Sequence, residues 1–297
     1  MLEILGSERN RYLSATVAMP LVILSILQPD AFLFKVTAML LLFWSAKEWS
    51  SLVSLFKIGS QLFTTITIAG FVILGLWVMP LLSHTAQYLV SAGMLSMLVL
   101  GTLPVVCAVF GMHGLLFCFQ SGLFWLFMGA VIHAALAFSF IILRDSSIEL
   151  MLALLLICWC NDTAAYLVGK HYGAWRITSL SPNKTWEGYL AGFFVLWPLI
   201  VWLFDQAPGT ITTLFSPQLQ ANLGIIPLAC LVACMTSGMQ LVGDIFESAL
   251  KRQADVKDSG VFLPGHGGLL DRLDSMFLVM PASSCLVLWN DFSWGLI

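Results

Sequence analysis

The stretch YLVSAGMLSMLVLGTLPVVCAVF, residues 88–110, contains no charged residue and is long enough to cross a membrane as a helix. It lies inside a longer charge-free region, since no Asp, Glu, Lys or Arg occurs between Lys57 and Arg144. Over the whole chain hydrophobic residues make up 59% and charged residues 10%, and the mean hydropathy is +0.93. Soluble domains usually have about 25% charged residues. These values exclude an ordinary soluble domain and predict an integral membrane protein.

Apolar segments of about 20 residues recur along the chain, which predicts an all-α, polytopic membrane protein with about nine transmembrane helices. The second segment is the weakest, because it contains Lys35, Lys47 and Glu48. We divide the chain into N-terminal transmembrane helices, 1–150, and a C-terminal transmembrane catalytic region, 151–297, without a soluble domain. The expected helices are 12–28, 31–53, 61–82, 88–110, 122–143, 148–169, 188–205, 224–246 and 275–295.

The Lys and Arg residues fall mainly on one side of the membrane if the N-terminus is cytoplasmic. The outer side then receives only Lys35 and Arg144, and the outer loop 206–223 has no basic residue. The positive-inside rule therefore places the loops around 170–187 and 247–274 in the cytoplasm. The net charge of −3 gives no reason to expect a nucleic-acid partner.

About a third of the charged residues lie in one stretch, DIFESALKRQADVKDSGVFLPGHGGLLDRLD, residues 244–274. The spacing of Asp244, Glu247 and Lys251 puts them on one face of a helix that leaves the membrane. Carboxylates that converge from two helix ends suit a hard divalent cation, and Lys and Arg beside them suit a phosphate-rich substrate. Charge at a membrane face is costly unless it binds something, so this stretch is the main candidate site.

Asp162 lies well inside an apolar helix, in the segment WCNDTAAYLVGKHYG, residues 159–173. A carboxylate there costs several kcal/mol unless it is paired or liganded. Two interpretations stay open: a hydrogen bond to a neighbouring helix, or a ligand for a cation or a cationic side chain.

The segment SPNKTWEG, residues 181–188, is typical of a helix start, because Ser181 suits a cap and Pro182 suits the first turn. Free backbone N–H groups at such a terminus, beside Lys184 and Thr185, would bind phosphate. A simple helix entry with a solvated lysine is the alternative.

The run from Ser248 to Asp274 resembles the signature of the phosphatidate cytidylyltransferases, also called CDP-diacylglycerol synthases. SPNKTWEG and Asp162-x-x-Ala165-Tyr166 also resemble that family, in the same order. The resemblance covers roughly residues 155–280 and implies an enzyme of phospholipid biosynthesis in a bacterial-type inner or plasma membrane. Such an enzyme joins CTP to phosphatidate by Mg²⁺-dependent in-line nucleotidyl transfer, gives CDP-diacylglycerol and pyrophosphate, and has its active site at the cytoplasmic face. A homodimer stays open.

The resemblance and the charge pattern together give candidate site residues. As metal ligands we expect Asp244 and Asp271, with Asp162 and Asp274 as further candidates. As catalytic residues we expect Asp244, Asp271, Lys257, Arg272 and His266. As substrate-binding residues we expect Ser181, Lys184, Thr185, Lys251, Arg252, Asp258, Gly267 and Gly268.

Three other interpretations stay open, and one of them, a non-catalytic scaffold, leaves the clustered carboxylates unexplained. A CTP-dependent polyprenol or phytol kinase would use similar substrates and loops. An ion-coupled transporter would use Asp162 and Asp244 as a relay, but transporters usually hold such charges near the membrane midplane, whereas most charges here lie in loops at one face.

Overall fold

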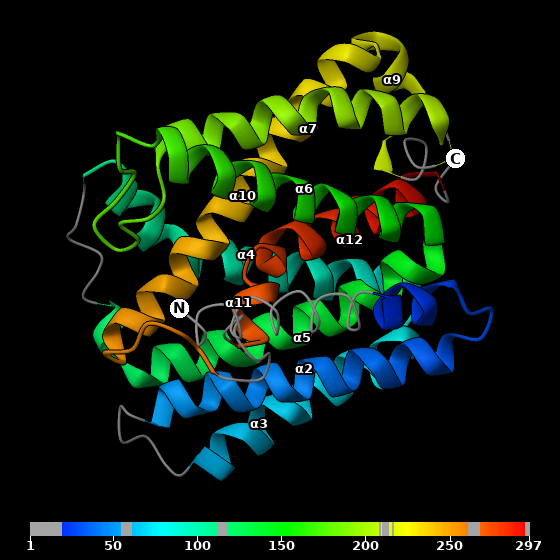
Figure 1. Ribbon diagram of the computed structural model, residues 1–297. Helices are drawn as coiled ribbons and strands as arrows, with labels where there is room; N and C mark the ends of the chain where they lie inside the picture. The colour runs from blue at the N-terminus through cyan, green and yellow to red at the C-terminus, as the bar shows by residue number, and fades with distance from the viewer. Residues whose placement is uncertain are drawn as a thin grey trace.

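The computed structural model describes residues 20–54, 61–111, 118–207, 209, 214–215, 217–260 and 268–294 (Figure 1). Within these ranges every regular element is a helix, and the single isolated bridge joins Arg176 and Thr185. The prediction of an all-α fold is confirmed. Residues 20–27 are helical. The helices that follow are α2 (Ala31–Ser54), α3 (Gln61–Ile73), α4 (His84–Val109), α5 (Gly122–Ser146), α6 (Ile148–Tyr172), α7 (Trp186–Gln206), α9 (Pro217–Leu223), α10 (Ile225–Gln253), α11 (Leu270–Leu273) and α12 (Met276–Trp294).

Helix α5 is the centre of the bundle, and every residue from 128 to 144 in it is buried. It packs against α2, α3, α4 and α12 (Figure 1). Helix α2 approaches closely at Gly129, where an added Cβ would lie 2.3 Å from the indole nitrogen of Trp49. That indole donates a hydrogen bond of 2.9 Å to the carbonyl oxygen of Trp125. The contact fixes the C-terminal half of α2 against α5.

Helices α6, α7 and α10 form a second group, in which α7 packs on both α6 and α10. Small residues allow the α6–α7 contact, since a Cβ on Gly188 would lie 2.7 Å from the carbonyl oxygen of Ala165. Small residues commonly let membrane helices approach each other in this way. Contacts of α10 with α12 and of α5 with α6 join this group to the helices that surround α5. The end of α6, the start of α7 and the last turns of α10 therefore come together.

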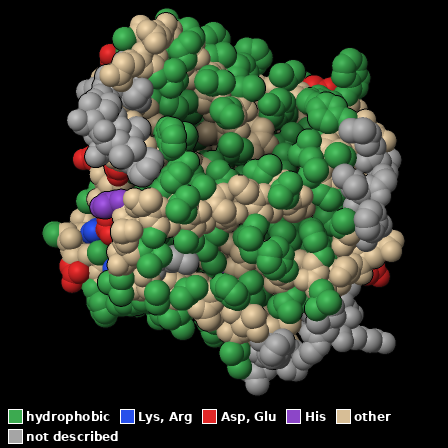
Figure 2. Space-filling view, turned by 180° about the vertical axis from the view of Figure 1, so that it is seen from behind, with side chains coloured by type: hydrophobic (Ala, Val, Ile, Leu, Met, Phe, Trp, Pro, Cys, Tyr) green, Lys and Arg blue, Asp and Glu red, His purple; other side chains and the backbone are tan. Residues whose placement is uncertain are grey.

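Five described helices are long and apolar enough to cross a membrane: α4, α5, α6, α7 and α10. Two shorter apolar helices span 64–78 and 276–291. Figure 2 shows hydrophobic side chains over the broad face of the molecule, with charged side chains toward its edges. Large apolar side chains such as Leu100, Phe194 and Ile226 are exposed, which suits contact with lipid. The chain is a polytopic membrane protein.

Helix α2 is not among those five, in agreement with the weakness of its sequence pattern. The ammonium groups of Lys35 and Lys47 lie over the rings of Trp77 and Trp44, at 5.5 and 4.7 Å from the ring centroids. Its third charged residue, Glu48, points into the protein and is buried.

Two expected elements differ from the structure. The helix expected over 61–82 changes at Leu74 to a π-helical turn (Leu74–Val78) and then to a 3-10 turn (Met79–Leu81). Pro80 lacks the N–H that an α-helix needs, and Gly75 packs directly against the α5 backbone. Part of the expected outer loop, 217–223, is the short helix α9.

Candidate active site

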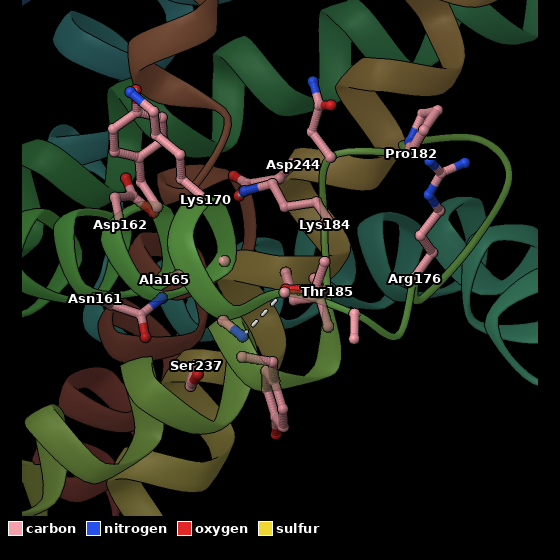
Figure 3. A pocket seen from close by; sticks show the side chains of 18 residues that line it. Asn161, Asp162, Ala165, Lys170, Arg176, Pro182, Lys184, Thr185, Ser237 and Asp244 are labelled. Atoms are coloured by element: carbon pink, nitrogen blue, oxygen red, sulfur yellow. Dashed lines mark hydrogen bonds and ion pairs between the residues drawn. The ribbon is translucent and has the colours of Figure 1, made fainter.

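A cavity of about 590 Å³ lies between α6, α7, α10 and the segment 173–185, and we call it the charged cavity (Figure 3). Acidic and basic side chains reach it from α6, from α10 and from the segment. Those in its wall are Asp162, Lys170, Arg176, Lys184 and Asp244, and the polar Asn161, Thr185 and Ser237 lie among them.

The segment 173–185 is held in a defined hairpin-like path before α7. The N–H of Ile177 donates to the carbonyl oxygen of Lys184 at 3.0 Å, and the N–H of Trp186 donates to that of Trp175 at 2.9 Å. The carboxylate of Glu187 accepts the N–H of Trp175 at 3.1 Å. The path directs the Lys184 side chain into the cavity (Figure 3).

The prediction that Ser181 and Pro182 start this helix is wrong. Helix α7 begins at Trp186, and its N-cap is Thr185, whose hydroxyl accepts the N–H of Gly188 at 3.2 Å. Ser181 lies earlier, in a turn closed by the N–H of Lys184 donating to its carbonyl oxygen at 3.1 Å. Its buried hydroxyl accepts a hydrogen bond from Ser248 on α10, so it joins the segment to that helix.

Lys184 and Asp244 form an ion pair across the charged cavity (Figure 3). The Asp244 side chain is 8% exposed, so the lysine is the cation that makes its burial tolerable. Burial alone would lower the pKa of Lys184, but the Asp244 carboxylate raises it well above its ordinary value. Lys184 therefore stays charged throughout the neutral range.

Asp162 and Asp274 lie close enough to this pair for their charges to interact with it. The Asp274 carboxylate accepts the N–H of Ser275 at 2.8 Å. Burial and the nearby carboxylates of Asp244, Glu247 and Asp162 raise the pKa of Asp274 well above its ordinary value. Three of the four expected metal ligands are thus brought together beside Lys184.

Asp271, the fourth expected ligand, lies in a second group with Lys251. The Lys251 ammonium lies 2.6 Å from the Asp271 carboxylate and also pairs with the fully buried Glu247. Asp271 further accepts the N–H of Gly268 at 2.8 Å and the hydroxyl of Ser259 at 3.0 Å. Burial would raise the pKa of Asp271, but the Lys251 charge lowers it below its ordinary value.

The four carboxylates expected to bind a metal ion divide between these two groups. In the part of the chain that the structure describes, no three His, Cys, Asp or Glu side chains are arranged to hold a metal ion. Lys184 and Lys251 supply the positive charge to the two carboxylate groups instead.

Glu48 on α2 is a site residue that the sequence reasoning missed. Its carboxylate accepts the N–H of Leu270 at 2.8 Å and the hydroxyl of Ser259 at 3.4 Å. Added Cβ atoms on Gly260 and Gly268 would each lie 2.5 Å from its oxygens, so the backbone at both glycines packs directly on it. The available signal was the one used for Asp162, an acid inside an apolar helix.

A second cavity, of about 370 Å³, lies on the other side of Asp162, and we call it the apolar cavity. Its wall is mainly hydrophobic and comes from 22–25, α2, α5, α6, the segment 269–273 with α11, and α12. Its polar members are Asp162, Asp271 and Arg272, with the hydroxyls of Ser25, Thr37 and Thr163. Asp162 is therefore in the wall of both cavities.

The other expected site residues are placed as follows. Arg252 is exposed and donates to the carbonyl oxygen of Val256 at 3.3 Å. Lys257 and Asp258 are exposed in the segment after α10. His266 and Gly267 lie outside the described residues.

Comparison with known proteins finds the Cytidylyltransferase family over residues 9–289. The phosphatidate cytidylyltransferase of Staphylococcus epidermidis is 36% identical over 148 residues, which are 49% of this chain and 51% of that protein. The enzyme of the same name from Bacillus subtilis is 41% identical over 126 residues, 42% of each chain. That from Staphylococcus aureus is 37% identical over 146 residues, 49% of this chain and 51% of its own. The alignments thus span about half the length of these curated relatives.

Proposed function

Because the chain belongs to the Cytidylyltransferase family, we propose that it is a phosphatidate cytidylyltransferase. In this reaction a phosphate oxygen of phosphatidate forms a bond to the α-phosphorus of CTP. The bond from that phosphorus to the oxygen bridging it to the β-phosphate breaks, and pyrophosphate leaves. The reaction needs charge neutralisation and in-line positioning, and no protein nucleophile.

The observation that carries the proposal is the shared wall at Asp162. The charged cavity suits a water-soluble triphosphate, and the apolar cavity suits an acyl chain. A lipid phosphate at the Arg272 end of the apolar cavity would lie beside the same carboxylate as a nucleotide in the charged cavity. A water-soluble nucleotide and a membrane lipid would thereby meet at the Asp162 carboxylate.

Basic side chains are placed to hold the phosphates in this arrangement. Lys184 lies beside Asp162 and Asp244 and would contact the α-phosphate. Lys170 and Arg176 in the same wall would contact the β- and γ-phosphates, and Arg272 would hold the lipid phosphate. A guanidinium suits that role because its fork matches two phosphate oxygens.

The carboxylate oxygens suit Mg²⁺ by type, because Mg²⁺ prefers oxygen ligands and shares them with phosphate, although the described side chains do not yet converge on one metal position. Burial is the main cause of the raised pKa of Asp274, and the carboxylates of Asp244, Glu247 and Asp162 add to it, so a cation bound among them would be attracted by all of these charges. We propose that Asp162, Asp244 and Asp274 would hold the ion, with Asp271 kept further from it by its bonds to Lys251, Ser259 and Gly268. When bound, Mg²⁺ supplies positive charge to the reacting phosphate.

The site would face the cytoplasm. Lys170 lies in the last turn of α6, Arg176 and Lys184 follow it before α7, and Lys251 lies in the last turn of α10, whereas Arg144 lies at the close of α5, next to the start of α6. The positive-inside rule supports a cytoplasmic position for the first four of these residues, where CTP is available.

The test is incubation of the purified protein with phosphatidate, Mg²⁺ and CTP labelled at the α-phosphate or at the γ-phosphate. We expect label in the lipid product from α-labelled CTP only, and loss of the reaction when a chelator removes the metal. Transfer of the γ-label to a lipid would instead show a kinase. No transfer of either label to phosphatidate would contradict the proposal.

A further inference from the structure

The apolar cavity carries charge at one end only. Its acidic and basic side chains are Asp162, Asp271 and Arg272. Asp162 and Arg272 lie close enough for their charges to interact, and Asp271 directly precedes Arg272, so the three form one charged end. The rest of the wall is hydrophobic apart from three side chains with hydroxyl groups.

These three hydroxyls are used within their own helices. Ser25, Thr37 and Thr163 each donate to a backbone carbonyl oxygen three or four residues earlier, at 2.7–2.9 Å. A hydroxyl that already donates in this way does not need a polar ligand. Beyond its charged end, the cavity therefore suits a hydrocarbon chain.

Helices α2 and α6 give the cavity its length, and α5 contacts both of them (Figure 1). The residues that α6 contributes recur every four positions, at Met151, Leu155 and Trp159, and lead to Asp162. Those of α2 lie between Phe34 and Leu41, also on one helical face. Along α6 the distance from Met151 to Asp162 is about 16 Å, at a rise of about 1.5 Å per residue.

Helices α2 and α6 begin at the same end of the bundle. Arg144, shortly before α6, donates to the carbonyl oxygens of Gln28 and Pro29, shortly before α2. Phe34 and Met151, which lie near the starts of these two helices, are therefore at the end of the cavity that is remote from the charges.

This remote end is closed. Ser25, Phe34 and Met151 line it and are at most 3% exposed, so little space remains beyond them. A chain that enters beside Asp162 would run along α6 and stop at these side chains.

We infer that the apolar cavity holds one acyl chain of phosphatidate and limits the length of that chain, an inference that rests on the proposed function. The cavity volume of about 370 Å³ is near the lower end of the range of about 300–1,000 Å³ for small-molecule sites. One chain fills it, and the other chain stays in the bilayer. A chain longer than the cavity has to displace side chains at the closed end, which a close-packed interior resists.

Thr37→Phe and Phe34→Ala change the length of the cavity in opposite directions. Thr37 is partly exposed and lies midway along the α2 wall, so a phenyl ring there should fill the remote half without disturbing the core. Phe34→Ala removes a ring from the closed end. The measurement is kcat/KM for dioctanoyl and for dioleoyl phosphatidate, each at the same mole fraction in detergent micelles.

We expect Thr37→Phe to lower kcat/KM for dioleoyl phosphatidate at least about tenfold, because the long chain must displace the new ring. The value for dioctanoyl phosphatidate should change little. Phe34→Ala should raise the ratio of the dioleoyl to the dioctanoyl value above that of the unmodified protein. The KM for CTP should stay normal in both variants, since neither residue is in the wall of the charged cavity.

A second readout does not depend on turnover. The rise in unfolding temperature caused by each phosphatidate, measured without CTP, should show the same change of preference. If Phe34→Ala does not fold, Thr37→Phe decides the matter alone.

The control is Val99→Phe, which adds a ring to α4 at a position that is 52% exposed and outside the walls of both cavities. It should leave the preference unchanged. An unaltered preference in folded Thr37→Phe would overturn the inference, and so would an equal fall for both lipids, because the cavity would then not measure chain length. Failure of the unmodified protein to make CDP-diacylglycerol would reject the proposed function, and the lipid-induced rise in unfolding temperature would still decide the inference.

Discussion

At the scale of single residues, the site is a set of buried charges that balance one another. Asp244 is paired with Lys184, and Asp271 with Lys251. A buried ion pair contributes little net stability, because desolvation offsets the attraction. Function is then the better explanation for keeping these charges inside a membrane protein.

Asp244→Asn tests the role of that carboxylate in turnover. Loss of its charge removes an electrostatic stabiliser beside the α-phosphate, so we expect kcat to fall at least about a hundredfold. Steady-state kinetics with both substrates saturating would measure it. The matched control, Asp145→Asn, changes a half-exposed carboxylate at the end of α5 and should keep the normal rate. A near-normal rate for Asp244→Asn at saturating Mg²⁺ would place the metal site elsewhere.

Glu48→Gln tests whether α2 positions the segment that carries Asp271. The neutral amide is a weaker acceptor for the Leu270 N–H and the Ser259 hydroxyl. We expect kcat to fall about tenfold with KM values little changed, the effect of about 1.4 kcal/mol in the transition state. Trypsin cleavage after the exposed Lys257 should also become faster.

Glu149→Gln, at the exposed start of α6, is the control for Glu48→Gln and should alter neither quantity. If Glu48→Gln leaves both the rate and the cleavage unchanged, then α2 has no positioning role.

At the scale of elements, α11 is a short helix whose placement depends on the charge of Asp271. The pKa of this residue is lowered in the folded protein relative to about 3.9 in an unfolded chain. Its contribution to stability is therefore present above the unfolded value and is lost as the pH falls through the folded value.

Asp271→Asn should reduce the free energy of unfolding by about 1.5–3 kcal/mol at neutral pH, the range for hydrogen bonds to a charged group. The difference from the unmodified protein should shrink below about pH 4. Thermal unfolding in detergent with a chelator, measured from neutral to acidic pH, would show it. A difference that does not depend on pH would mean that the Asp271 charge is not the cause.

Much of the element-scale arrangement follows from apolar segment length, which located each helix from α2 to α7 as well as α10 and α12. The start of α7 was wrong because Ser181 and Thr185 are both good caps, and the hydrogen bonds of the preceding segment decide between them. Asp162, Lys184 and Asp244 were found as unusual charges in or beside apolar helices. The contact of Glu48 with Leu270 joins residues far apart in sequence, and helical periodicity carries no information about it.

At the scale of the whole molecule, the charged ends of the helices divide into a site end and an opposite end. Arg144 belongs to the opposite end and is 9% exposed. Its guanidinium donates to the carbonyl oxygens of Gln28 at 2.5 Å and Pro29 at 3.2 Å, between the helix at 20–27 and α2. It connects helices and lies far from the site.

Arg144→Ala should therefore lower stability and leave the chemistry intact. Loss of hydrogen bonds from a charged group to buried carbonyls should reduce the free energy of unfolding by about 1.5–3 kcal/mol. The kcat per folded molecule and both KM values should stay normal. Thermal unfolding and kinetics on the same detergent sample would separate these effects, and a large loss of kcat in folded protein would contradict the position of the site.

The central claim is that a nucleotide in the charged cavity and a lipid in the apolar cavity meet at Asp162. The most direct measurement is the kcat of Asp162→Asn with CTP and phosphatidate both saturating. The second measurement is the rise in unfolding temperature caused by α,β-methylene-CTP, an analogue that cannot be cleaved between its α- and β-phosphates. The account predicts a fall in kcat of at least about a hundredfold in a folded protein whose unfolding temperature the analogue still raises. A near-normal kcat would contradict it, because the carboxylate shared by the two cavities would then take no part in the transfer.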